Sequence, residues 1–138
     1  MYCSHMNSKS ELVPIVLVTG ATGFIGRHLA EELVAHGWRV RVFVRKSECL
    51  SDWLSSHCEI VVGDITTGQG LVEAVNGVDF IFHCAANVHT WGQWAQYYSV
   101  NVVGVKNLLE AVAKHNPNLS RFVHLSTVDV YGFPMHSC

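Results

Sequence analysis

The segment that most constrains this chain lies near its start, where three glycines separate an apolar run from an amphipathic pattern. Residues 15–18 read Ile-Val-Leu-Val, a short β-branched run that is typical of a buried strand. From Ile25 to Leu33, apolar residues recur every four positions, which is the pattern of one face of a helix. The sequence therefore predicts a strand, a tight turn and a helix in direct succession.

Each glycine in this turn has its own physical use. Gly20 permits unusual backbone angles, Gly23 leaves the backbone open to a pyrophosphate, and Gly26 lets the helix pack closely. The free N–H groups and the positive dipole end at the helix start also favour a phosphate. The alternative is a strand–helix turn that binds no ligand. The dinucleotide-binding residues predicted in this segment are Gly20, Thr22, Gly23, Phe24, Ile25 and Gly26.

The spacing Thr-Gly-x-x-Gly-x-x-Gly over residues 19–26 resembles the short-chain dehydrogenase/reductase superfamily. The Gly-Phe-Ile-Gly ending resembles its extended branch, which includes NAD-dependent epimerases and dehydratases, 3β-hydroxysteroid dehydrogenases and dihydroflavonol reductases. The resemblance, which covers about residues 15–134, implies an α/β fold: a Rossmann-like doubly wound parallel sheet. We expect an NAD(P)-binding domain over residues 14–138 and a disordered tail over residues 1–13.

The composition agrees with one such domain. The chain has 138 residues, of which 49% are hydrophobic and 14% charged, as expected for parallel strands covered by helices on both faces. The predicted strands are 15–19, 39–44, 58–62, 78–86 with its exit, and 121–126. The predicted helices are about 24–36, 49–56, 67–76 and 95–115.

Several classes of function are disfavoured by charge and by cysteine usage. The net charge of −2 gives no basic footprint for nucleic acid, and no apolar run is long enough for a membrane span. Residues 1–10 lack the apolar core of a signal peptide. The five cysteines are scattered without metal-ligand or redox spacing, so we predict no metal site and a cytoplasmic location with free thiols.

The end of the second predicted strand bears on cofactor choice. An acidic residue there would hydrogen-bond the ribose 2′-hydroxyl and favour NAD. Val44 stands there instead, followed by Arg45 and Lys46, and a cation can hold a 2′-phosphate. The Val-Arg pair also resembles the NADP-using reductases of the extended branch. We therefore predict NADP, with NAD possible, the alternative being two solvated loop charges.

After the third predicted strand, Asp64 and Ile65 occupy a position that the resemblance places beside the adenine ring. The alternative role for Asp64 is to cap the predicted helix 67–76. After the fourth strand, His83-Cys84-Ala85-Ala86 resembles the branch's His-x-Ala-Ala motif. The small side chains of Ala85 and Ala86 would let the cofactor ribose and nicotinamide pass. We interpret His83 as an interior or wall histidine, and Cys84 as a small core residue.

The loop over residues 87–94 carries His89, Trp91 and Trp94, which could line an apolar substrate pocket. The alternative is that the two tryptophans cap the following helix and the protein body. The predicted helix 95–115 contains a segment, residues 101–109, that resembles the Asn-Val-x-Gly-Thr-x-Asn-Leu-Leu segment of the branch. Val105 stands where the branch usually has threonine. The resemblance implies that Asn101 supports a proton-relay water through a helix distortion; the alternative is a bond to a neighbouring backbone group. In relatives the outer part of this helix pairs subunits, so a homodimer is expected.

Residues 126–132, Ser-Thr-Val-Asp-Val-Tyr-Gly, resemble the branch's catalytic Ser/Thr segment. The resemblance implies that Thr127 hydrogen-bonds the substrate carbonyl or alcohol; the alternative is a strand-end hydroxyl that satisfies backbone. Tyr131 is not assigned as proton donor, because Met135 stands four residues on where a lysine is required. No tyrosine in the chain has a lysine at that spacing. We therefore expect a fragment that ends before the last strands and the substrate-binding part.

The predicted function is NAD(P)-dependent oxidation or reduction of a carbonyl or alcohol in a steroid-, flavonoid- or sugar-like small molecule. This chain would supply the cofactor-binding half and be inactive alone. The alternatives are a nucleotide-sugar epimerase or dehydratase, a non-catalytic dinucleotide-binding sensor or interaction module, and a non-functional truncation.

Overall fold

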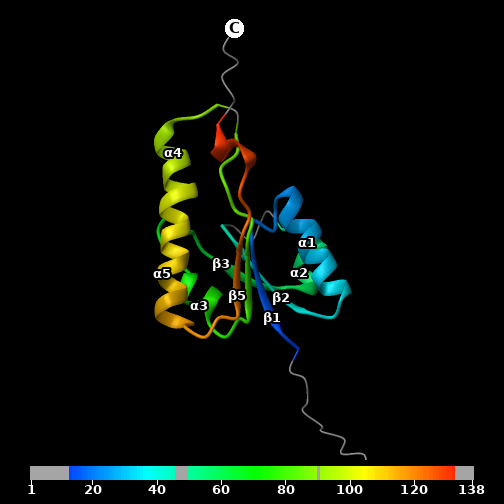
Figure 1. The fold of residues 1–138 in the computed structure, drawn as a ribbon. Helices are drawn as coiled ribbons and strands as arrows, with labels where there is room; N and C mark the ends of the chain where they lie inside the picture. The colour runs from blue at the N-terminus through cyan, green and yellow to red at the C-terminus, as the bar shows by residue number, and fades with distance from the viewer. Residues whose placement is uncertain (1–12, 46–49, 90, 133–138) are drawn as a thin grey trace, which may run out of the picture.

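The computed structural model describes residues 13–45, 50–89 and 91–132. Within these ranges the chain forms one sheet with helices on both of its faces (Figure 1). The predictions for Lys46 and for the tail before residue 13 lie outside the described residues. The described part contains no helix that is long and apolar enough to cross a membrane.

The five-stranded sheet is parallel throughout and has the order β3-β2-β1-β4-β5. From β1 the chain adds β2 and β3 on one side, and then returns to add β4 and β5 on the other side of β1. The strand order therefore reverses between β1 and β4. In open α/β sheets, ligands bind in the crevice at the carboxyl ends of the strands where this reversal occurs. The strands are β1 (Ile15–Thr19), β2 (Arg39–Val44), β3 (Glu59–Val62), β4 (Phe80–His83) and β5 (Arg121–His124).

Helices cover the sheet in two groups (Figure 1). The helices α1 and α2 lie on one face, whereas α3 and the long column from α4 to α5 lie on the other. Each face has its own buried cluster, since Val16 and Val18 pack with the first group and Leu17 and Ile81 with the second. The helices are α1 (Phe24–Ala35), α2 (Asp52–His57), α3 (Leu71–Val75), α4 (Trp94–Tyr98), the π-helix η2 (Ser99–Gly104), α5 (Val105–His115) and the 3₁₀ helix η3 (Val128–Tyr131).

The five strands are confirmed, but β3 starts at Glu59 instead of residue 58, β4 spans Phe80–His83 within the predicted 78–86, and β5 ends at His124 instead of residue 126. Two helix predictions need correction. The predicted helix 49–56 starts at Asp52, because Ser51 caps it by accepting the backbone N–H of Leu54 at 3.3 Å. The predicted helix 67–76 is only α3, because Gly68 and Gly70 adopt positive φ angles just before it. The predicted helix 95–115 starts one residue earlier, at Trp94, and contains a π-helical turn at η2, which is a helix distortion at Asn101 as the resemblance implied.

Side-chain amides tie the loops at the edges of the sheet to the helices. Asn107 on α5 donates to the carbonyl oxygens of Ile65 and Thr66 at 2.8 and 3.1 Å. Asn116 donates to those of Val75 and Val78 at 2.9 and 2.7 Å. The Asn107 bonds hold the loop after β3 beside the carboxyl edge of the sheet, and the Asn116 bonds hold the turn between α3 and β4.

Candidate functional site

A cleft of about 500 Å³ opens at the carboxyl edge of the sheet, beside the adjacent strands β1 and β4 at which the strand order reverses. It lies between the glycine turn, the ends of β2, β3 and β4, and the start of the α4–α5 column. Eight of the predicted cofactor residues line it together: Gly20, Thr22, Gly23, Arg45, Asp64, Ile65, Ala85 and Ala86. The size and position fit an extended small-molecule ligand.

The glycine turn has the close contacts that its sequence predicts. Gly20 adopts a φ of +74°, and a Cβ there would lie 2.7 Å from the backbone nitrogen of Ala85. A Cβ on Gly26 would overlap the carbonyl of Gly20, so the helix packs against the turn itself. The Gly23 N–H donates to the Gly20 oxygen at 3.0 Å, and α1 starts directly afterwards without a side-chain cap. The first N–H groups of α1 therefore have no capping side chain to compete with an anion.

Three predicted residues of the turn lie beside the cleft and do not line it. The side chains of Phe24 and Ile25 are 81% and 52% exposed, and Phe24 packs on the ring of His28 with centroids 4.7 Å apart. Gly26 is buried beneath the turn. A contact of these three residues with a ligand in the cleft would therefore involve their backbone N–H groups and not their side chains.

The cation after β2 is placed for an anionic ligand. Arg45 is exposed and lines the cleft, next to the buried side chains of Phe43 and Val44. None of the ion pairs formed within the described residues involves Arg45. Its guanidinium is therefore free of the described carboxylates and available to a phosphate.

Asp64 is part of a tight turn at the end of β3. Its Oδ1 accepts both the backbone N–H and the hydroxyl of Thr66, each at 2.7 Å. The interpretation of Asp64 as a helix cap is wrong, because α3 starts at Leu71 and its N-cap is Gly70. Asp64 lines the cleft together with Ile65 and Thr66, the residues that follow β3.

The exit of β4 forms one wall of the cleft. The buried ring of His83 is 1% exposed, which confirms the interior interpretation, and its Nδ1 is hydrogen-bonded to Thr19 Oγ1 at 2.6 Å. Thr19 Oγ1 also accepts the Ala85 N–H at 3.3 Å. Burial, with a smaller contribution from His124, lowers the pKa of His83 from 6.5 to about 4, so the ring is neutral near pH 7.

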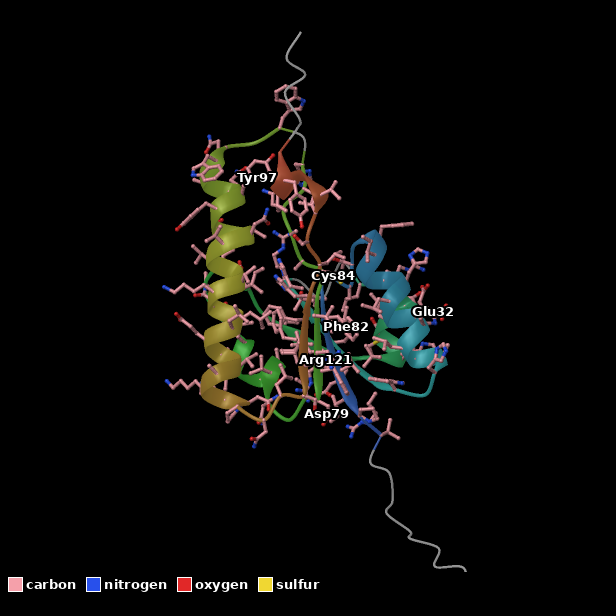
Figure 2. The ribbon with its side chains drawn as sticks, in the orientation of Figure 1. Glu32, Asp79, Phe82, Cys84, Tyr97 and Arg121 are labelled. Atoms are coloured by element: carbon pink, nitrogen blue, oxygen red, sulfur yellow. The ribbon has the colours of Figure 1, made fainter. Side chains whose placement is uncertain are left out.

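The sequence predicted Cys84 as a small core residue, and this prediction is wrong. It is half-buried and lines the cleft, and burial raises the pKa of its thiol. Figure 2 shows it at the end of the sheet opposite Asp79, which directly precedes β4, and Arg121, the first residue of β5. The thiol is therefore a neutral, small part of the cleft wall.

Asn101 lies in η2 and bonds a distant loop instead of its own helix. Its Oδ1 accepts the Asn87 N–H at 2.7 Å, and its Nδ2 donates to the Asn87 carbonyl at 3.0 Å. The alternative of a bond to a neighbouring backbone group is thus wrong, since the two residues are fourteen positions apart. Because Asn87 lines the cleft, Asn101 fixes the segment that follows Ala86.

Thr127 follows β5 at the same carboxyl edge of the sheet but is not part of the cleft lining. It is exposed, and its carbonyl accepts the Val130 N–H at 3.4 Å at the start of η3. Trp91 and Trp94 are 89% and 76% exposed. This exposure argues against caps on the protein body, although the Trp94 ring contacts Tyr98 of α4 with centroids 6.2 Å apart.

Several lining residues were not singled out from the sequence: Phe43, Thr66, Asn87, Gln96, Ser99 and Val100. His89, which the sequence offered as a possible pocket wall, does line the cleft. Gln96, Ser99 and Val100 have the i, i+3, i+4 spacing of one helix face, so the signal was present once that helix was oriented toward the strand ends. Within the part of the chain that the structure describes, no three His, Cys, Asp or Glu side chains form a group suited to a metal ion.

Comparisons with known proteins agree with this geometry. The family model described as NAD dependent epimerase/dehydratase family matches residues 16–137. A 3-beta-hydroxysteroid dehydrogenase of Mycolicibacterium neoaurum is 39% identical over 124 residues, which cover 83% of this chain and 32% of the relative. A 2-alkyl-3-oxoalkanoate reductase of Stenotrophomonas maltophilia is 34% identical over 122 residues, covering 83% of this chain and 34% of the relative.

Solved structures are similar over the same part. A short-chain dehydrogenase/reductase superfamily protein from Agrobacterium tumefaciens with bound NAD has a TM-score of 0.72 and 32% identity, covering 86% of this chain and 34% of that one. A UDP-glucuronic acid 4-epimerase from Bacillus cereus in complex with NAD has a TM-score of 0.71 and 30% identity, covering 86% of this chain and 42% of that one. The chain thus spans about a third of the length of the curated relatives that it matches.

Proposed function

The chain belongs to the NAD dependent epimerase/dehydratase family, and from that membership we propose that it binds NADP(H) for hydride transfer to or from a carbonyl or alcohol carbon. The observation that carries this proposal is the cleft in which the glycine turn, Arg45, Asp64 and the β4 exit meet. The Gly20 position supports the fit, because a Cβ there would fill the space beside Ala85. When bound, the nicotinamide supplies or accepts the hydride.

Each end of the cleft has a role in this proposal. The backbone of residues 20–26 and the start of α1 bind the pyrophosphate. Arg45 pairs with the 2′-phosphate, which distinguishes NADP from NAD. Asp64 and Ile65 contact the adenine, and Ala85 and Ala86 leave room for the nicotinamide ribose. Two of the structural neighbours have NAD bound, so similarity to them does not favour NADP over NAD. The proposal of NADP depends on Arg45 alone.

On the substrate side, we assign Thr127 to orient the carbonyl or alcohol and Asn101 to support proton transfer. The exposed indole of Trp91, in the loop between the cleft residue His89 and α4, favours an apolar substrate over a sugar, because exposed large apolar groups mark binding surfaces. The names of the two curated relatives refer to a hydroxysteroid and an oxoalkanoate, which are compounds of this kind.

A nucleotide-sugar epimerase is the second candidate, favoured by the structural similarity to the UDP-glucuronic acid 4-epimerase. The two candidates differ in cofactor use. An epimerase returns its hydride to the same substrate and retains NAD, whereas a reductase exchanges NADP(H) with solution. Selective, reversible binding of NADPH therefore favours the reductase.

We also propose a homodimer through the helical column. The side chains of Trp94, Tyr98, Val102 and Leu109 are 46–76% exposed along α4, η2 and α5, at spacings that place them on one side. Light scattering of the chain and of Val102→Asp tests this proposal: loss of a dimer on substitution supports it, and a monomeric unsubstituted chain contradicts it. The free Cys58 and Cys84 thiols support a cytoplasmic location.

The cofactor proposal is tested by titrating the chain with NADPH and with NADH and following nucleotide fluorescence. We expect tighter binding of NADPH, and Arg45→Asp should abolish the preference by placing a carboxylate at the 2′-phosphate. Arg39→Asp is the matched control, because Arg39 is an exposed arginine at the other end of β2. An unchanged preference in Arg45→Asp would contradict the assignment.

A further inference from the structure

Three polar side chains form a row across the carboxyl edge of the sheet. The parallel register pairs Thr19 with His83 and His83 with His124, so the three lie on adjacent strands at the same level. Thr19 and His83 are fully buried, at 0% and 1% exposure, whereas His124 is exposed. The rings of His83 and His124 stack with centroids 5.3 Å apart. The row begins at the glycine turn and ends on the outer strand.

The burial of His83 is costly for a residue that serves packing alone. Its Nε2 has no hydrogen-bond partner within the described residues, and a buried polar atom without a partner is destabilising. An apolar side chain of similar size would fill this place without that cost. The hydrogen bond between His83 Nδ1 and Thr19 Oγ1, at 2.6 Å, is the feature that an apolar side chain could not reproduce.

The Thr19 hydroxyl is the link to the cleft. It is bonded to the imidazole on one side and accepts the Ala85 N–H at 3.3 Å on the other. Ala85 is also where the β4 exit approaches the turn, since a Cβ on Gly20 would lie 2.7 Å from the Ala85 nitrogen. A change in the χ1 rotamer of Thr19 would move Oγ1 and leave the Ala85 N–H without this acceptor, at the place where the two cleft walls touch.

We propose that His83 is a positioning residue for dinucleotide binding, which acts by holding the Thr19 hydroxyl so that Thr19 fixes Ala85 in the cleft wall. The expected effect on dinucleotide binding rests on the proposed function, in which Ala85 and Ala86 lie beside the nicotinamide ribose. His83 itself touches neither ligand nor reacting atoms. Its role is to hold Thr19 Oγ1 in one position. This role is the same whether Oγ1 or His83 Nδ1 carries the proton of their hydrogen bond.

The test compares two substitutions of His83 in the whole chain. His83→Asn keeps a polar atom near the position of Nδ1 and removes the unpaired Nε2, whereas His83→Leu keeps volume and removes the bond. Ile81→Val is the matched control, because Ile81 is a buried residue of the same strand and face that contacts no cleft residue through a side-chain hydrogen bond. The readouts are the Kd for NADPH and the hydrogen-exchange rate of the Ala85 amide.

We expect His83→Leu to weaken NADPH binding and to accelerate Ala85 exchange by about five- to tenfold, the effect of losing one buried hydrogen bond. His83→Asn should restore both values to within about twofold, and Ile81→Val should change stability only. Thr19→Val removes the same bond from the other side. Its effect should not add to that of His83→Leu, since both act through one contact.

Additive effects of Thr19→Val and His83→Leu would overturn the proposal, as would unchanged Ala85 exchange in folded His83→Leu. Should these variants not fold, imidazole ¹⁵N shifts in the unsubstituted chain decide the matter. A hydrogen-bonded Nδ1 supports the proposal, and a free Nδ1 overturns it. Failure of the proposed function is distinguishable, because an unsubstituted chain that ignores NADPH would still report the Thr19–His83 coupling through Ala85 exchange.

Discussion

Acidification should destabilise this fold through His83 at a pH well above that at which carboxylates are protonated. The imidazole has a pKa of 6.5 when unfolded and about 4 in the buried site. Between these values the unfolded chain binds more protons than the folded chain, so the free energy of unfolding falls as the pH falls. The full contribution of the neutral ring is present above about pH 6.5 and is lost progressively toward about pH 4.

The size of the effect follows from the two pKa values. Linkage gives a loss of ~2 kcal/mol in the free energy of unfolding between about pH 7 and about pH 5, and ~3 kcal/mol by about pH 4. A loss of this size is a large fraction of the stability of a typical domain. The nearby His124 adds to the effect, because its positive charge opposes protonation of the ring stacked against it.

Urea unfolding at a series of pH values, followed by tryptophan fluorescence, measures this loss. His83→Asn is the informative comparison, because asparagine does not titrate and every other histidine is unchanged. The steep loss between about pH 6.5 and about pH 5 should disappear in His83→Asn and persist in His36→Asn, whose side chain is exposed. Equal pH dependence in the chain and in His83→Asn would refute the reasoning.

Three further predictions concern the cleft. Gly26→Ala should lower the free energy of unfolding by roughly 1–3 kcal/mol and abolish NADPH binding, because the Cβ overlaps the Gly20 carbonyl; chemical denaturation and nucleotide titration measure both, and retained binding would contradict it. Asn101→Ala should speed hydrogen exchange at Asn87 by about tenfold, and an unchanged rate would show that its two bonds do not hold the loop. In a full-length version of the protein, Thr127→Ala should cut turnover by about 10²–10³-fold with little change in cofactor affinity, and equal losses in both would argue for a structural role.

The sequence predicted the parts of the fold that depend on local pattern. The β-branched run before Gly20 and the apolar repeat after it define β1 and α1, because both signals are complete within a dozen residues. The positive φ of Gly20 was likewise implied by its place in the turn. The eight lining residues that were predicted all lie at strand ends or in the glycine turn.

What the sequence did not predict depends on contacts between distant segments. The start of α3 is set by Gly70, and the Asp64 carboxylate, for which a helix cap was the alternative role, accepts the Thr66 N–H instead. Likewise, the π-helical turn holds Asn101 against Asn87 in another loop, a pairing that no periodicity reveals. The bond between Thr19 and His83 spans 64 positions and required the register of β1 and β4.

The measurement that tests the central claim most directly is a ¹H–¹⁵N NMR titration of the chain with NADPH. The account predicts that backbone amide shifts concentrate in residues 20–26 and 84–87, where the glycine turn and the β4 exit line one cleft. Saturating NADPH that leaves these amides unshifted in a folded chain would contradict it.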